Sequence, residues 1–309
     1  MSLTGGLGNQ LFQLAFASSI TNNNFGLEWK IARPRLNSNG IPEICSFRLP
    51  ERSQLLTNRR KGSKLVSKSQ GFILRMGHSP RGIEKIKFIR FLIKQIANLI
   101  SLLYFREIRR IVYSTNIGFC DIKIPKKRIL IVGYFQSYKW AIRPDVYRSL
   151  ADMEPLTQSP ELKNYINLAK SEKPLIIHVR LGDYLSEENF GIPSNEYYKV
   201  ALFKMLSSYK YGSIWIFSDE ICKAQSYLAF DFPLNVRWIS AINDSSSETL
   251  ELMRHGYGYI IGNSSFSWWG AFLSRNSDVP VVAPAPWFRN ISEPADIIPP
   301  SWTRLPAQF

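Results

Sequence analysis

Cysteine is scarce in this chain of 309 residues, and its three copies, Cys45, Cys120 and Cys222, are scattered along the sequence. None of them forms a C-x-x-C pair, so a zinc site or a thiol redox centre is not indicated. They are also too few for a disulfide framework. Cysteine usage therefore fits a reducing compartment such as the cytoplasm.

Long hydrophobic runs are lacking as well. The first ten residues have neither a basic start nor an apolar core, so we predict no signal peptide. The longest uncharged apolar run in the most basic part of the chain covers residues 95–105. This is about half of the roughly 20 residues that a membrane-spanning helix needs. We therefore expect a cytoplasmic protein without an integral membrane segment.

Two nucleotide-binding signatures are missing. The chain contains no D-x-D sequence, so carboxylates that hold a divalent metal on a nucleotide diphosphate are not indicated. The glycine-rich residues 5–10, G-G-L-G-N-Q, lack the third glycine of G-x-G-x-x-G and the acidic residue expected after the next strand. A nicotinamide-dependent dehydrogenase is therefore poorly supported.

Positive charge is in excess, with a formal net charge of +15. The excess is concentrated in residues 51–110, the basic segment, which contains fifteen Lys and Arg against three acidic residues, a net +12. A nucleic-acid binder would more often carry its charge across a whole folded face, so we predict no nucleic-acid partner. A local block instead indicates a surface that contacts something anionic.

A helical pattern runs through residues 83–110 of the basic segment. Lys87, Arg90 and Lys94 recur at helical spacing and form a polar stripe. The apolar residues that fall on the other side are Ile86, Ile89, Ile93, Ile96 and Ile100. Two interpretations stay open: an ordinary helix with a solvated basic face, or an interfacial helix lying on anionic lipid.

Strand and helix patterns alternate through the carboxyl-terminal half. We expect strands at 175–179, 213–217, 235–239, 257–261 and 279–282, and helices at 195–207, 248–254 and 267–274. Such alternation predicts a parallel sheet with right-handed crossovers, and hence a Rossmann-like domain. The amino-terminal half holds a further unit, with a very short first strand, the loop 5–10 and a helix from near Leu11. We place the domains at 1–165 and 166–309.

Three of the expected strands end in polar residues. These are His178, Arg180 and Asp183 at the first strand, Asp219 and Glu220 at the second, and Asn263, Ser264, Ser265 and Phe266 at the third. Because parallel strands end at the same edge of a sheet, we expect the three clusters to converge where open α/β sheets bind ligands.

The chemistry of these clusters favours an anionic ligand. The guanidinium of Arg180 is suited to a phosphate, and serines at a helix start add free N–H groups and a favourable dipole. Ser264 and Ser265 are also explained by simple helix capping, and Asp219 and Glu220 by a solvated turn. For His178 we favour a ligand contact over a satisfied core histidine. Trp268 and Trp269 are assigned to the core.

Five sequence motifs, taken together and in order, carry a family resemblance. They are G-G-L-G-N-Q-L-F-Q-L-A-F-A at 5–17, V-G-Y-F-Q-S at 132–137, I-H-V-R-L-G-D-Y at 177–184, I-F-S-D-E at 216–220 and N-S-S-F-S-W-W-G-A-F-L-S at 263–274. The chain resembles the α-1,2-fucosyltransferases of glycosyltransferase family 11 from residue 5 to about residue 288.

The resemblance implies a GT-B architecture, with two Rossmann-like domains facing a cleft. The first would take the acceptor and the second the donor. It implies metal-independent, inverting transfer of L-fucose from GDP-β-L-fucose to O-2 of a β-galactoside, with no separate cofactor. The acceptor would be an oligosaccharide or lipid-linked glycan of the cell surface, such as an O-antigen. With the basic segment, this predicts peripheral contact with the anionic inner face of the membrane.

The resemblance also assigns roles to single residues. Arg180 would hold the diphosphate, His178 would lie near the nucleoside, and Ser264, Ser265 and Phe266 would line the diphosphate and sugar. Asn9 would approach the reacting centre, with Gly6, Gly8 and Asp219 on the donor side. Asp183 is a candidate general base by position, and a structural role in its loop is an equal alternative.

The chain departs from the family pattern at three places. Leu181 stands where many members have a second arginine, and Arg254-His255 replaces a stretch that usually contains cysteine. The helix before the third cluster often opens with an aspartate that reads the guanine. The nearest acid here is Glu248, which we predict as a donor-binding residue in its place. Two alternatives therefore stay open: another nucleotide sugar as donor, or a non-enzymatic basic protein that binds membrane or nucleic acid.

Overall fold

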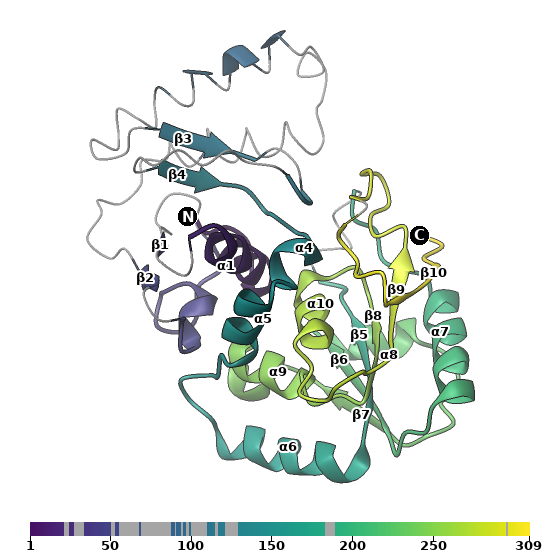
Figure 1. Cartoon of the computed structure of the whole chain (residues 1–309). Helices are drawn as coiled ribbons and strands as arrows, with labels where there is room; N and C mark the ends of the chain where they lie inside the picture. The colour runs from purple at the N-terminus through teal and green to yellow at the C-terminus, as the bar shows by residue number, and fades with distance from the viewer. Residues whose placement is uncertain are drawn as a thin grey trace. The chain divides into compact units, whose positions relative to one another are not determined.

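The computed structural model describes most of the chain in two compact units (Figure 1). The described residues are 1–21, 25–27, 34–50, 53–55, 68, 88–89, 91–93, 95–96, 99, 110–114, 117–120, 129–182, 189–294 and 296–309. Unit 1 contains Met1–Cys45, Leu49–Met153 and Pro294–Ile297, and unit 2 contains Ser46–Arg48, Glu154–Glu293 and Ile298–Phe309. The main division thus falls at Met153, ahead of the position between 165 and 166 expected from the sequence.

Unit 1 is built from short parallel strand pairs and helices. β1 (Phe25–Leu27) pairs with β2 (Ser53–Leu55), and β3 (Arg110–Tyr113) pairs with β4 (Ile129–Val132). The helices are α1 (Leu7–Thr21), the 3-10 helix η1 (Glu43–Ser46), α4 (Tyr138–Ala141) and α5 (Pro144–Ala151). The very short first strand is confirmed, since a single parallel bridge joins Ser2 to Val132.

Helix α1 begins at Leu7, so the predicted start near Leu11 is wrong by one turn. The reason lies in a distant residue: the Glu43 carboxylate accepts a hydrogen bond of 2.7 Å from the Leu7 N–H. A carboxylate at this point satisfies a free amide and the positive end of the helix dipole. Gly5 makes the preceding turn at φ +72°, a conformation that favours glycine.

Unit 2 contains an all-parallel sheet in the strand order β10-β9-β8-β5-β6-β7. Its strands are β5 (Leu175–Val179), β6 (Ile214–Ser218), β7 (Val236–Ile239), β8 (Gly258–Ile261), β9 (Val281–Ala285) and β10 (Thr303–Pro306). The helices are α6 (Pro160–Glu172), α7 (Asn195–Ser208), α8 (Ile221–Tyr227), the 3-10 helix η4 (Ile242–Asp244), α9 (Ser246–Met253) and α10 (Ser265–Phe272). The α/β class is confirmed. The strands and helices expected in this half are found, and α8, β10 and η4 were not foreseen.

The order of the strands reverses direction at β5. The chain goes from β5 to β6 and β7 on one side, then crosses to β8, β9 and β10 on the other. This is the doubly wound order of Rossmann domains, and such sheets bind ligands at the carboxyl ends of the two strands that flank the reversal. The switch point of this sheet therefore lies between β5 and β8.

Alternation along β5 divides its side chains between two layers. Leu175, Ile177 and Val179 belong to the core formed with α7 and α8, so His178 lies on the opposite face of the sheet. Figure 1 shows α7 on one face of the sheet and α9 and α10 on the other. Trp268 and Trp269 of α10 are fully buried, which confirms their assignment to the core.

The described residues between 88 and 99 are helical, as the sequence predicts. On the predicted apolar side, Ile96 is exposed, whereas Ile89 and Ile93 are half-buried. Lys87, Arg90 and Lys94 lie outside the described residues, and so do Ile86 and Ile100. Within the described part of the chain, no helix is long and apolar enough to cross a membrane.

Candidate active site

The three polar clusters meet at one edge of the unit 2 sheet, as predicted. Strands β8, β5 and β6 are neighbours, so their carboxyl ends lie side by side. The Gly262 N–H donates a 3.2 Å hydrogen bond to the His178 carbonyl, which carries the pairing of β5 and β8 to the end of β8. The residues that follow β5 and β8 therefore leave the sheet next to each other, at its switch point.

Arg180 is held at this edge by Asp219. One guanidinium nitrogen lies 3.1 Å from Asp219 Oδ2, and both side chains are mostly buried. The same carboxylate accepts hydrogen bonds of 3.0 Å from the Leu181 and Gly182 N–H groups. Asp219 therefore orients the arginine and fixes the backbone after it. This interaction replaces the solvated turn that we considered for Asp219.

Gly182 is required at its position by this arrangement. A Cβ built on Gly182 would lie 2.4 Å from Asp219 Oδ2, well inside the contact distance of real atoms. Any side chain there would displace the Asp219 carboxylate or the loop. Steric contact with Asp219 thus explains directly why the R-L-G motif has a glycine at this position. Asp183, the candidate base that follows it, lies outside the described residues.

His178 is buried against the switch point and is 5% exposed. Burial, and to a lesser extent the neighbouring Arg180 charge, lower the pKa of His178 to about 3, and Asp219 opposes the shift. The imidazole is therefore neutral at physiological pH. Its Nδ1 is buried without a hydrogen-bond partner among the described residues, and its ring centre lies 6.1 Å from that of Phe266. A buried nitrogen of this kind is suited to a hydrogen bond with a ligand.

The serine cluster caps helix α10. Ser264 is the N-cap residue, and its hydroxyl accepts a 3.3 Å hydrogen bond from the Phe266 N–H. The capping interpretation is thus confirmed for Ser264, whereas Ser265 and Phe266 lie in the first turn and are half-buried. Asn263 donates to the Phe190 and Gly191 carbonyls, so the side chain before the cap fixes a neighbouring loop. The remaining amides of this first turn form a site that favours negative charge.

Glu248 has a structural partner that the sequence did not reveal. It is fully buried in α9, and its carboxylate accepts hydrogen bonds from the Ser159 N–H and hydroxyl and from the Thr157 hydroxyl. These contacts join α9 to the start of α6. Because the carboxylate is engaged and buried, we leave Glu248 out of the proposed donor site.

The glycine-rich loop forms a polar arrangement of its own within unit 1. Asn9 Oδ1 accepts a 2.7 Å hydrogen bond from Gln136 Nε2, which links the first motif to V-G-Y-F-Q-S. Gly5 packs against Asn9, since a Cβ at Gly5 would lie 2.4 Å from Asn9 Nδ2. Gly6 and Gly8 lie at the start of α1. The family assignments of Asn9, Gly6 and Gly8 stay predictions.

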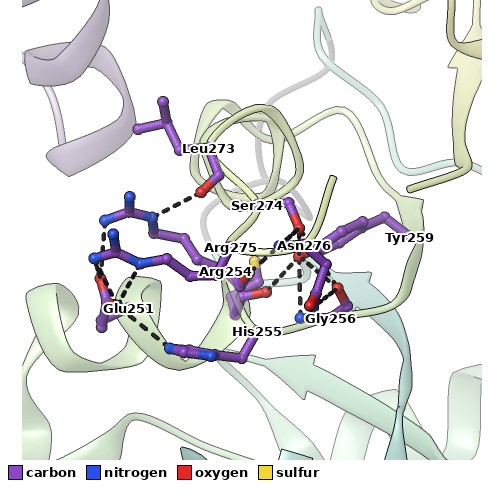
Figure 2. A network of polar contacts seen from close by, with 10 residues as sticks. Glu251, Arg254, His255, Gly256, Tyr259, Leu273, Ser274, Arg275 and Asn276 are labelled. Carbon is purple, nitrogen blue, oxygen red and sulfur yellow. Dashed lines mark hydrogen bonds and ion pairs between the residues drawn. The ribbon is translucent and has the colours of Figure 1, made fainter. Parts of the chain in front are cut away.

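A network that sequence reasoning missed ties the far ends of α9 and α10 together (Figure 2). The Glu251 carboxylate pairs with Arg254 at 2.8 Å, Arg275 at 2.9 Å and His255 at 3.4 Å. Arg254 Nε also donates to the Leu273 carbonyl at 2.8 Å. Burial alone would raise the pKa of Glu251, but these partners together lower it to about 2. The sequence signal of this network was the E-x-x-R-H spacing of residues 251–255, at the end of α9.

Among the described residues, no group of three or more His, Cys, Asp and Glu side chains is arranged to hold a metal ion. The side chains at the switch point are instead an arginine held by an aspartate, a neutral histidine and a serine-capped helix start.

A doubly wound sheet with these groups at its switch point is typical of the α/β domains that bind nucleotides. Comparison with known proteins identifies the family. The model of "Glycosyl transferase family 11" matches residues 120–305, which is more than half of the chain, so the chain belongs to that family.

Two curated relatives come from Escherichia coli. "O-antigen biosynthesis glycosyltransferase WbnK" is 26% identical over 333 aligned residues, covering 98% of this chain and 99% of that protein. "Alpha-1,2-colitosyltransferase" is 26% identical over 189 residues, covering 58% of this chain and 63% of that protein. The match to the colitosyltransferase thus spans less than two thirds of its length.

Solved structures similar to this chain include the fucosyltransferase NodZ from Bradyrhizobium. The similarity has a TM-score of 0.44 at 12% sequence identity and covers 88% of this chain and 91% of that one. A NodZ α-1,6-fucosyltransferase crystal soaked with GDP-fucose is similar with a TM-score of 0.41 at 11% identity, covering 94% and 95% of the two chains.

Proposed function

We propose that this glycosyltransferase transfers L-fucose from GDP-β-L-fucose to a hydroxyl of a surface-glycan oligosaccharide, O-2 of a β-galactoside, with inversion and without a metal. The acceptor class is that of an O-antigen, in line with the name of the WbnK relative. The observation that carries the proposal is the unit 2 switch point, where Arg180, held by Asp219, follows β5 beside the start of α10.

The donor diphosphate fits this edge electrostatically. The reaction breaks the bond between the sugar C1 and the diphosphate oxygen, so negative charge builds on the leaving diphosphate. Arg180 supplies a fixed positive charge, and the amides at the start of α10 supply oriented dipoles. Donors that are preorganised where charge develops provide the largest stabilisation in reactions of this type. Asp219 is then a positioning residue, since it acts through Arg180.

His178 contributes a hydrogen bond rather than a charge. With its pKa lowered to about 3 by burial, the neutral imidazole neither repels Arg180 nor serves as an effective base near pH 7. We assign it to a polar atom of the nucleoside. Phe266, whose ring lies nearby, supplies an apolar wall.

The acceptor hydroxyl attacks C1 from the face opposite the diphosphate and loses its proton to a base. Asp183 is the candidate by its position in the R-L-G-D motif. Asn9 is assigned to the reacting centre on the family resemblance.

The experiment that tests the donor is transfer from a panel of nucleotide sugars, with the linkage read from the product by NMR. GDP-fucose, GDP-colitose, GDP-mannose and UDP-galactose are each combined with β-galactosides. The proposal predicts the highest kcat/KM with GDP-fucose and an α-1,2 product. Preference for a UDP-sugar, or no transfer with any donor, overturns it.

Colitose is the second candidate sugar, because a relative is named for its transfer. Colitose is L-fucose without the 3-hydroxyl, so the two donors differ by one polar group. A site that hydrogen-bonds this hydroxyl would reject the deoxy sugar by a factor of about 10⁴ or more, whereas an apolar wall would discriminate only about 10²-fold. The ratio of the two kcat/KM values therefore decides between them.

A further inference from the structure

An apolar face of the helical residues between 88 and 99 is turned to solvent. Its members are Phe88, Phe91, Leu92, Ile96 and Leu99, which expose between 49% and 70% of their surface. We call these five residues the exposed apolar face. On the same helical stretch, Ile89 and Ile93 are half-buried.

The spacing of these residues shows that they form one stripe. Positions 88, 92, 96 and 99 are separated by four, four and three residues, which places them on the same side of an α-helix. Single exposed apolar residues are ordinary, but a continuous stripe of large ones marks an interaction site. The stripe lies beside the half-buried isoleucines, so the helix has distinct inner and outer sides.

The chemistry of the partner follows from the charge of the segment to which the stripe belongs. The stripe belongs to the basic segment, which has a net charge of +12 over residues 51–110. Large apolar side chains combined with a high density of Lys and Arg suit the boundary between anionic headgroups and acyl chains. Along an α-helix, positions 88 and 99 are roughly 17 Å apart, less than the hydrocarbon thickness, so this face would lie along a bilayer.

A second copy of the chain fits this surface less well. Pairing two identical faces would bring two basic segments of +12 together, and like charges repel. A nucleic acid would match the charge but would leave the aliphatic side chains Leu92, Ile96 and Leu99 without a role.

We propose that the exposed apolar face inserts into the surface of an anionic membrane and holds the enzyme there. This docking surface is separate from the sugar transfer proposed above and does not depend on which nucleotide sugar is the donor. It supplies a specific set of side chains for the peripheral membrane contact that the charge of the sequence predicts.

The test is co-flotation of the full chain with vesicles of equal parts phosphatidylglycerol and phosphatidylcholine. Phe91→Asp and Leu92→Asp each remove an apolar contact and add a repelled negative charge. Each variant is expected to lower the vesicle partition coefficient at least about tenfold. Transfer to a soluble oligosaccharide acceptor is expected to stay at the wild-type level, which separates this proposal from the proposed function.

Phe203→Asp is the matched control, because Phe203 on α7 exposes 59% of its surface and Phe91 exposes 57%. The control should bind vesicles like the wild type. The proposal is overturned if the wild type does not float with the vesicles, or if both aspartate variants float like the control. It is also overturned if Phe91→Asp instead abolishes a dimer seen by light scattering or the binding of a labelled RNA.

Discussion

At the scale of single residues, the site depends on how one carboxylate is shared. Asp219 pairs with Arg180 and also receives the Leu181 and Gly182 N–H groups, so three donors hold it in place. A carboxylate that accepts hydrogen bonds from several donors is fixed in place, so it holds the arginine paired with it in one orientation. The proposed binding of a diphosphate requires such an orientation.

Replacing Arg180 by alanine is expected to lower kcat by a factor on the order of 10²–10³, since a lost electrostatic donor costs about 3 kcal/mol in transition-state stabilisation. Arg180→Lys should recover little, because an ammonium lacks the planar fork. Steady-state transfer from GDP-fucose measures both variants, with thermal unfolding as the check on folding. Near-wild-type turnover by Arg180→Ala contradicts the assignment.

Asp219→Ala should raise the donor KM and lower kcat, while the acceptor KM stays unchanged, because Arg180 and its loop lose their support. The matched control is Glu220→Ala, since the neighbouring carboxylate has only an exposed 3.5 Å ion pair with Lys223 in the described structure. Such surface pairs contribute little. Equal kinetic effects of the two substitutions would refute a positioning role for Asp219.

The buried histidine makes a prediction about pH. Burial holds the pKa of His178 at about 3, against about 6.5 in the unfolded chain, so unfolding takes up a proton between these values. The contribution of neutral His178 to the free energy of unfolding is therefore complete above pH 6.5. It falls as the pH drops, by up to about 1.4 kcal/mol per pH unit.

The measurement is urea unfolding of the wild type and of His178→Gln between pH 5 and 6.5. This window avoids Glu251, whose lowered pKa of about 2 affects stability only below about pH 4.5. In the variant, the free energy of unfolding should depend less steeply on pH. The same slope of unfolding free energy against pH in both proteins would show that His178 is not buried in its neutral form.

At the scale of elements, the two ends of α10 have different tasks. Its first turn belongs to the switch point, while its last turn is tied to Arg254 through the Leu273 carbonyl (Figure 2). The helix has eight residues and is about 12 Å long, so a shift at one end is transmitted to the other. The Glu251 network therefore helps to fix the position of Ser264 and Ser265, which we assign to the proposed donor site.

Arg254→Ala is expected to destabilise unit 2 by about 3 kcal/mol, because it breaks a buried ion pair and leaves the Leu273 carbonyl without its donor. Lys223→Ala is the control, since its 3.5 Å pair with Glu220 is exposed on both sides and should cost under about 1 kcal/mol. Urea unfolding followed by tryptophan fluorescence compares the two. Similar losses of unfolding free energy in the two variants would show that the Glu251 network stabilises the fold no more than an exposed ion pair does.

Much of the element order could be predicted, because each strand of unit 2 is a short apolar run between turn residues. The convergence of Arg180 and Ser264 followed from parallel pairing alone. Helix boundaries were less predictable. The start of α1 at Leu7 depends on Glu43, and α6 begins where Glu248 accepts hydrogen bonds from Ser159. Neither contact has a local sequence signal.

At the scale of the whole molecule, charge and chemistry occupy different parts of the chain. The basic segment belongs to residues 51–110, and the switch point is formed by unit 2. A protein divided in this way can bind an anionic surface through one part while another part binds a nucleotide. Salt should therefore weaken vesicle binding more than transfer, since exposed charges are screened more than buried ones.

Chelation tests the predicted metal independence of the whole enzyme. With no D-x-D sequence, the charge of the leaving diphosphate is assigned to Arg180 and the amides of α10. Transfer in excess EDTA is therefore expected to proceed at the rate seen with added magnesium. A loss of more than about tenfold that magnesium restores would require a bound metal in the reaction.

The sequence by itself determined the α/β class and the three strand ends of the site, because hydrophobic period and parallel pairing depend on local residue order. Its motifs determined the family. Tertiary structure decided which partner each polar group has. Asp219 pairs with Arg180, Glu248 bonds to the start of α6, and the five side chains of the exposed apolar face lie in solvent. The reason is physical: a hydrogen bond or a buried surface depends on distances between residues that are far apart in the chain.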